Sequence, residues 1–379
     1  MIINLNENIF FEIKEYYLSQ IITPVKEQYK AERAKDPKNI LFDYLKEENL
    51  KEIIVGKIYD NKVWKFIDNY RKTMCLAYLD INNNGHVQTT WKYIKENNIP
   101  LFSSTQKNEQ YIELRRYLFS KYNNTLVQDA LGQNIDYTNS FNSFKVMQNH
   151  IKDYFYEMNQ ILEKIFDYNF IKKAGLRSEI LSSTKINICP YCNRQFINSY
   201  EVKESLRVSA HLDHFYPKSK FPLFALSLYN FIPSCAHCNS ILKRDKVLDF
   251  VYPINNKNNM EKVFFEVSCN NYRQLVGLEE PQIKIKKNNI TNFDEAFSRN
   301  FIELFRIESI YEFHKDFVKN LKLKENMLED NYKDWLESIL KINISYSSYY
   351  YLIFGYEYNE EELFNRPLSK LVHDTVFNA

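Results

Sequence analysis

Apolar residues recur through most of the chain at the spacing of an amphipathic helix. One stripe comprises Ile151, Tyr154, Phe155, Met158, Ile161, Leu162, Ile165 and Phe166. A second stripe comprises Ile307, Ile310, Phe313, Phe317 and Leu321. Because an α-helix turns once every ~3.6 residues, such stripes gather apolar side chains on one face. The pattern predicts helices on both sides of a central region, with Gly175 as the last helix stop before a short link into that region.

The central region has a different pattern. Val208, Ala210 and Leu212 alternate with Ser209, His211 and Asp213. A period of two is typical of a strand with one buried face. We therefore expect a strand over 208–213. The changes in pattern predict a helical N-terminal domain (1–185), a small central module (186–252) and a helical C-terminal region (253–379).

Composition narrows the classes of fold and partner. The 379 residues include only 6 Gly, and an all-β protein needs many tight turns, so a mainly helical fold is favoured. The net charge of +2 excludes a polycation that binds nucleic acid by bulk attraction, so any basic surface must be local. No apolar run reaches the roughly 20 residues of a membrane span, and residues 1–14 lack a signal layout. We expect a cytoplasmic protein without a membrane partner.

Four of the six cysteines form two C-x-x-C pairs, Cys189 with Cys192 and Cys235 with Cys238. A C-x-x-C turn places both sulfurs on one side of a tight loop. Two such turns supply the four thiolates that tetrahedral zinc favours in structural sites. The alternatives are buried free thiols or a redox pair, and neither explains the doubled spacing. We predict a structural zinc with no open position for water.

The segment between the two cysteine pairs carries the residues of a nuclease motif. Asp213 and His214 are adjacent, Asn230 lies before the second cysteine pair, and Asn239 follows it directly. This order resembles the zinc-containing form of the HNH endonuclease family. The resemblance implies a mainly α protein with a small central ββα-metal (HNH, His-Me finger) module that carries the four-cysteine zinc site.

The resemblance also implies a role for each motif residue. His214 is expected to act as the general base, because an imidazole that titrates near neutrality can accept a proton from water. Asp213 and Asn239 offer the carboxylate and amide oxygens that suit Mg²⁺ or Mn²⁺. By the family pattern, Asn230 shapes the loop and orients His214. The implied products carry 5′-phosphate and 3′-hydroxyl ends.

Basic residues in the module are candidates for phosphate contacts. They are Arg194, Lys218, Lys220, Lys243 and Arg244. Lys243 lies four residues after Asn239, so the two share a face of the helix expected there. His211 shares the face of Asp213 if the strand persists, and a supporting or solvated role is favoured for it.

Three functions fit these residues. The first is metal-dependent cleavage of DNA. The run from Phe215 to Ser219, together with the segment from Asn230 to Asn239, is similar to HNH nuclease subunits of Septu-type and retron-linked bacterial antiphage systems, which implies a defence role and an ATPase partner. The second is a zinc-ribbon module that binds nucleic acid or a partner without cleavage, and such a module has no need for the Asp213, His214, Asn230 and Asn239 set. The third is a toxin nuclease that cleaves RNA with the same site.

Overall fold

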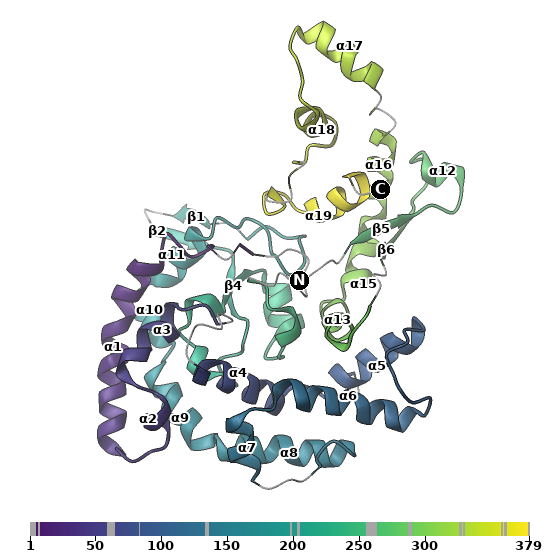
Figure 1. Cartoon of the computed structure of the whole chain (residues 1–379). Coiled ribbons are helices and arrows are strands. Elements are labelled where there is room, and N and C mark those ends of the chain that lie inside the picture. Colours follow the sequence, from purple (N-terminus) through teal and green to yellow (C-terminus); the bar gives the residue numbers. More distant parts are fainter. Residues whose placement is uncertain are drawn as a thin grey trace.

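The computed structural model describes residues 5–6, 8–58, 65–82, 84–132, 136–197, 199–202, 205–254, 264–286, 290–325, 328, 330–357, 359 and 362–377. For residues 199–202, 205–208, 330 and 377 the description is of the backbone alone. Figure 1 shows a body of helices around short strands, with α16, α17 and α18 extending away from it as an arm. The described residues confirm a mainly helical protein.

The N-terminal helices surround one side of the body (Figure 1). Helix α1 packs against α3 and α9, and α4 packs against α6, α7 and α8. Side-chain caps set two of the helix starts, since Asn124 accepts from the amide of Leu126, and Ser140 from that of Ser143. The helices are α1 (Lys14–Lys35), α2 (Leu41–Tyr44), α3 (Leu50–Val55), α4 (Lys65–Tyr78), α5 (His86–Glu96), α6 (Lys107–Tyr122), α7 (Thr125–Leu131), α8 (Phe141–Tyr154), α9 (Tyr156–Ile165), α10 (Asn169–Lys173) and α11 (Leu176–Ser183).

The strands form three two-stranded antiparallel sheets. The pairs are β1 (Ser199–Val202) with β2 (Ser205–Val208), β3 (His211–His214) with β4 (Phe231–Ser234), and β5 (Phe265–Ser268) with β6 (Gln282–Ile285). In the second sheet Asp213 is opposite Ile232 and His214 is opposite Phe231. A π-helical segment, η4 (His237–Lys243), follows β4. The chain order is therefore strand, long loop, strand and helix.

The C-terminal region is also mostly helical. Its helices are α12 (Tyr272–Leu275), α13 (Phe293–Ser298), α14 (Asn300–Leu304), α15 (Ile307–Tyr311), α16 (Lys315–Glu325), α17 (Asp330–Leu340), α18 (Tyr346–Phe354) and α19 (Ser369–Val372). Helix α19 runs into a second π-helical segment, His373–Phe377. No helix among the described residues has both the length and the apolar character needed to cross a membrane.

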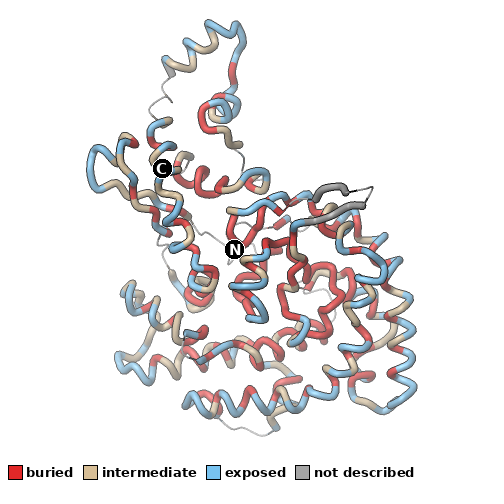
Figure 2. The backbone as a smooth tube through the Cα atoms, turned by 180° about the vertical axis from the view of Figure 1, so that it is seen from behind, coloured by how far each residue is buried: buried red, intermediate tan, exposed pale blue. Residues whose placement is uncertain are grey.

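One hydrophobic core cluster joins all three regions expected from the sequence, from Leu5 to Leu371. Figure 2 shows its buried residues concentrated in the body, whereas the arm is mostly exposed or partly buried. All four residues of β4 are buried. A second, smaller cluster around Leu321, Tyr349 and Phe354 supports the arm. The β3–β4 hairpin thus lies inside the helical body, which fixes its side chains from several sides.

A buried carboxylate ties the central region to the N-terminal helices. Asp249 accepts hydrogen bonds from Arg71 of α4 at 2.5 Å, from Tyr216 at 2.5 Å and from Tyr122 of α6 at 2.9 Å. Arg71 and Asp249 are both buried. Because Arg71 of α4 and Tyr216 bond the same oxygen of this buried carboxylate, Asp249 holds the loop containing Tyr216 against α4.

Local expectations from the sequence pattern were wrong at several places. The strand expected over 208–213 is interrupted, since β2 ends at Val208 and β3 begins at His211. Gly175 adopts a left-handed conformation as expected of a helix stop, but α11 starts immediately after it. Phe313 is 84% exposed because a 3-10 turn between α15 and α16 rotates it off the predicted face.

Candidate functional site

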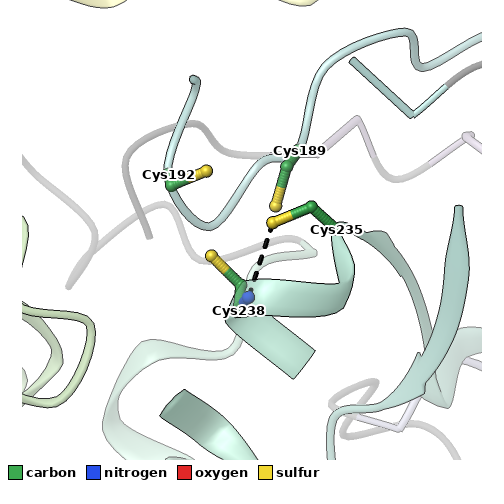
Figure 3. Close-up of side chains that lie close together, drawn as sticks. All are labelled: Cys189, Cys192, Cys235 and Cys238. Atoms are coloured by element: carbon green, nitrogen blue, oxygen red, sulfur yellow. Dashed lines mark hydrogen bonds between the residues drawn. The ribbon is translucent and has the colours of Figure 1, made fainter. Parts of the chain in front are cut away.

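The four cysteines of the two C-x-x-C pairs converge (Figure 3). Their sulfur atoms all lie within 4.8 Å of one another, and all four residues are buried. None is in a disulfide. A tetrahedron with Zn–S bonds of about 2.3 Å has S–S edges of about 3.8 Å, so this cage fits a zinc ion. With four protein donors and no solvent access, the predicted metal is structural.

Each cysteine pair is placed by a short turn at the end of an extended segment. In the first, the amides of Cys192 and Asn193 donate to the carbonyl of Cys189 at 3.3 and 2.7 Å. In the second, which leads from β4 into η4, the amide of Cys238 donates to the sulfur of Cys235 at 3.4 Å (Figure 3). Burial raises the pKa of Cys189, and hydrogen bonds among the thiols raise the pKa of Cys238 and lower that of Cys235. All four would therefore be thiolates only with a bound cation.

The first cysteine pair is also the anchor of the C-terminal region. Tyr311 donates to the carbonyl of Cys192 at 2.7 Å. The side chain of Asn193 donates to the carbonyl of Leu363 at 2.9 Å and accepts from the amide of Lys370 at 2.9 Å. Asn193 has a φ of 49°, a conformation that Asn tolerates better than most residues. The metal cage therefore supports the base of the arm.

Asp213 lies on β3 with a buried carboxylate, 3% exposed. Its Oδ1 accepts from Lys243 Nζ at 3.1 Å, and its Oδ2 accepts from the hydroxyl of Tyr191 at 2.5 Å. Tyr191 belongs to the first C-x-x-C turn, so one hydrogen bond connects the metal cage to Asp213. Burial and, to a smaller extent, the charge of Asp213 raise the pKa of Tyr191. The hydroxyl therefore stays protonated and donates to Asp213.

Lys243, at the end of η4, is fully buried. Besides its ion pair with Asp213, its amine donates to the carbonyl of His214 at 2.7 Å. Burial lowers the pKa of Lys243, whereas Asp213 opposes that change. The phosphate contact predicted for Lys243 therefore requires its amine to leave Asp213. Sequence spacing gave the correct face of η4 but could not show how deeply that face is covered.

His214 ends β3, and its ring is partly exposed. The ring makes edge contacts with Tyr168 and Phe231, with centroids 4.9 and 5.1 Å away. Its Nε2 lies 3.0 Å from the carbonyl oxygen of Ala225. A carbonyl can only accept, so Nε2 carries the proton and Nδ1 of the neutral ring is an acceptor. Burial, and then the charges of Lys218 and Lys243, lower the pKa of His214 to about 3.

Asn230 is fully buried and holds the loop between β3 and β4. Its side-chain amide donates to the carbonyls of Tyr216 at 2.9 Å and Phe224 at 3.0 Å. Its Oδ1 accepts from the amide of Tyr216 at 2.8 Å. Phe224 precedes Ala225, the residue that accepts from His214. Asn230 therefore fixes the loop segment on which the orientation of the His214 ring depends.

Asn239 and His211 meet across the interface between η4 and β3. The Nδ2 of Asn239 and the hydroxyl of Ser240 both lie 3.3 Å from Nδ1 of His211. His211 and Asp213 alternate with Leu212 along β3 and both contact η4, at Asn239 and Lys243 respectively. Asn239 is partly exposed. His211 thus supports Asn239 directly, a contact that the shared strand face suggested without identifying the partner.

The remaining predicted phosphate contacts lie in different environments. Lys218 and Arg244 are exposed. Lys220 forms an ion pair with Asp245 at 2.9 Å. Arg194 donates from Nε to Nε2 of His314 at 2.8 Å, and burial followed by the charge of Arg194 lowers the pKa of His314, which favours the neutral ring as acceptor. For Lys220 and Arg194, a phosphate contact would have to compete with these bonds.

Two tyrosines in the site were not identified from the sequence. Tyr191 lies between the first two cysteines, where its position inside a metal-binding turn was the available signal. Tyr168, just before α10, contacts His214 from a distant part of the chain, and no local pattern marks it. No family model, curated protein or solved structure matches this chain.

Proposed function

We propose that this protein is an HNH-type endonuclease that hydrolyses phosphodiester bonds in DNA, with His214 as the general base. The environment of His214 carries the proposal. Its Nε2 is tied to the carbonyl of Ala225 at 3.0 Å, so its Nδ1 is free of the proton and can accept one. Its pKa of about 3 keeps the ring neutral near pH 7, and the proposal requires this pKa to rise towards neutrality when substrate binds.

The arrangement around His214 also supports an HNH module. The segments β3, β4 and η4 follow one another with the order strand, strand and helix. The buried Asn230 holds the connecting loop, and Asp213 and Asn239 lie on the two facing segments β3 and η4. A zinc-ribbon module that only binds a partner would need the cysteine cage but not a histidine with one ring nitrogen fixed by a carbonyl.

The proposed reaction is a direct attack of water on phosphorus. His214 accepts a proton at Nδ1 from the attacking water, and the water oxygen forms a bond to phosphorus. The bond between phosphorus and the 3′ oxygen breaks, and that oxygen takes up a proton from solvent. The products are a 5′-phosphate and a 3′-hydroxyl.

The donor set near His214 fits a hard divalent cation. Asp213 supplies a carboxylate, and Asn239 on the facing segment supplies an amide oxygen. The Nζ of Lys243 lies 3.1 Å from Oδ1 of Asp213, so the surroundings of this carboxylate favour a positive charge. Asp213 and Asn239 are the residues that would hold Mg²⁺ or Mn²⁺, in competition with Lys243. When bound, such an ion would neutralise charge on the phosphate and on the leaving oxygen.

A nicking assay on supercoiled plasmid with Mg²⁺ or Mn²⁺ tests the proposal. Wild type should nick the plasmid, and His214→Ala should lose activity by about 100-fold or more. His150→Ala removes an exposed histidine of α8 and should retain full activity. Undiminished cleavage by His214→Ala would refute the assignment of the base.

The same assay separates the alternative functions. Absence of cleavage of both DNA and RNA with any of these metals would favour the binding module. Cleavage of RNA alone would favour the toxin nuclease. A role in bacterial antiphage defence with an ATPase partner rests on the sequence resemblance of the run from Phe215 to Ser219 and the segment from Asn230 to Asn239. Activity that requires an added ATPase subunit would support it.

A further inference from the structure

Positive charges gather around Tyr168, next to His214 but outside the central module. Tyr168 lies 4.9 Å from the His214 ring, centroid to centroid. The amine of Lys218 lies 4.7 Å from the Tyr168 ring centroid, and that of Lys172, in α10, lies 5.8 Å from it. Two amines from distant segments thus share one aromatic ring beside the proposed base. Lysine amines over an aromatic face are weakly stabilised, but they repel each other.

Two further basic residues extend this group along the N-terminal helices. Lys173 follows Lys172 at the end of α10, and both are exposed. Arg177, in α11, donates to the carbonyl of Ala210 at 2.7 Å, so its guanidinium lies at the start of β3. Its charge also acts on the hydroxyl of Tyr168. The group therefore runs from α10 and α11 to the segment after β3.

These cations differ from other lysines nearby because they have no acidic partner among the described residues. Lys164 pairs with Glu32, Lys185 with Glu12 and Lys220 with Asp245. Within the described ranges, Lys172, Lys173 and Lys218 form no such ion pair, and the nearby Asp167 is bonded by Asn169. A group of exposed like charges without counter-ions creates a positive potential that favours an anionic ligand.

We propose that α10, α11 and Lys218 form a surface that binds the phosphate backbone of the nucleic acid beside the scissile bond. This inference rests on the proposed function for the position of the scissile phosphate at His214. Duplex DNA carries about one phosphate per 3.4 Å along each strand. A strand with one phosphate at His214 therefore carries others within reach of Lys172, Lys173 and Lys218. The N-terminal helices thereby contribute to substrate binding.

The test measures binding separately from cleavage. A fluorescein-labelled DNA duplex is titrated with full-length protein by anisotropy, without added divalent metal, over a range of salt concentrations. The variant Lys172→Ala/Lys173→Ala should weaken binding by roughly tenfold and reduce the salt dependence of log Kd by about 2, since each lost phosphate contact contributes about 0.9. The variant Lys38→Ala/Lys341→Ala removes two exposed lysines elsewhere and should bind like wild type.

Equal binding by the two double variants would overturn the proposal. Binding of polyglutamate without binding of a DNA or RNA duplex would also overturn the proposal, because the surface would then bind an acidic protein. In cleavage assays the α10 variant should raise KM and leave kcat unchanged. If the duplex is bound through α10 but never cut, the surface stands and the proposed function fails. If it is cut with no effect of Lys172 and Lys173, the function stands and the surface fails.

Discussion

One hydrogen bond, from Tyr191 to Asp213, connects the cysteine cage to the Asp213 site. The two sites differ in how they would bind a cation. In the cage, four like donors converge from two turns and point at one another. At Asp213, both carboxylate oxygens already have protein partners, Lys243 and Tyr191. A cage without internal counter-charge must bind a metal to be stable, whereas a carboxylate neutralised by a lysine does not. Under the proposed function, the cage would hold a metal that belongs to the fold, and Asp213 would hold one that exchanges.

The largest effect is expected from breaking the cage. Cys192→Ser should release zinc and destabilise the protein by on the order of 4 kcal/mol, because metal loss is among the most costly single changes. The arm should loosen as well, since Tyr311 and Asn193 hold it to this turn. Zinc content and thermal unfolding measure the effect. Cys269→Ser, at a partly exposed free cysteine, is the control and should retain zinc.

A smaller effect is expected at the contact that joins the two sites. Tyr191→Phe removes the hydroxyl that donates to Asp213 at 2.5 Å and leaves a buried carboxylate oxygen without that partner, at a cost of about 1–3 kcal/mol. Zinc should be retained, and the metal concentration needed for half-maximal cleavage should change. Tyr252→Phe is a matched control, because Tyr252 donates to the carbonyl of Tyr229 rather than to the site. Loss of zinc from Tyr191→Phe would contradict the separation of the two sites.

The smallest expected effect is on the pH dependence of stability. The pKa of His214 is about 3 in the folded protein, below the ordinary value of about 6.5. As the pH falls below 6.5, the unfolded chain therefore binds a proton at His214 that the folded chain does not, and stability decreases. Replacing His214 with Gln should remove this part of the decrease, measured by urea unfolding at pH 7 and pH 5. An identical decrease in both proteins would contradict a His214 ring that stays neutral in the folded protein.

The sequence was most informative where the chemistry depends on spacing. Two C-x-x-C pairs predicted a cage because few structures other than a metal site need cysteines at this doubled spacing. The four sulfur atoms do converge. A loop role for Asn230 was implied by the family resemblance alone, and periodicity gives no sign of it. Its bonds to Phe224 and Tyr216 depend on the fold of a long loop that has no repeating pattern.

The sequence was least informative where distant segments meet. Nothing local to Lys243 indicates that its amine is buried on Asp213, because that burial depends on how β3 packs against η4. Tyr168 contacts His214, and Lys172 of α10 lies near Tyr168, only because of how the N-terminal helices pack. The interrupted strand at Ser209–Ala210 shows the same limit, since a period of two persists across a bend that tertiary structure imposes.

The most direct test of the two-metal account is metal content and cleavage measured on one sample before and after mild chelation. After dialysis against EDTA, one zinc per chain should remain and DNA cleavage should be lost. Added Mg²⁺ or Mn²⁺ should then restore cleavage without any change in zinc. Loss of zinc in parallel with activity, with recovery only upon addition of zinc, would contradict an account in which the cage is structural and the Asp213 site binds a second, exchangeable ion.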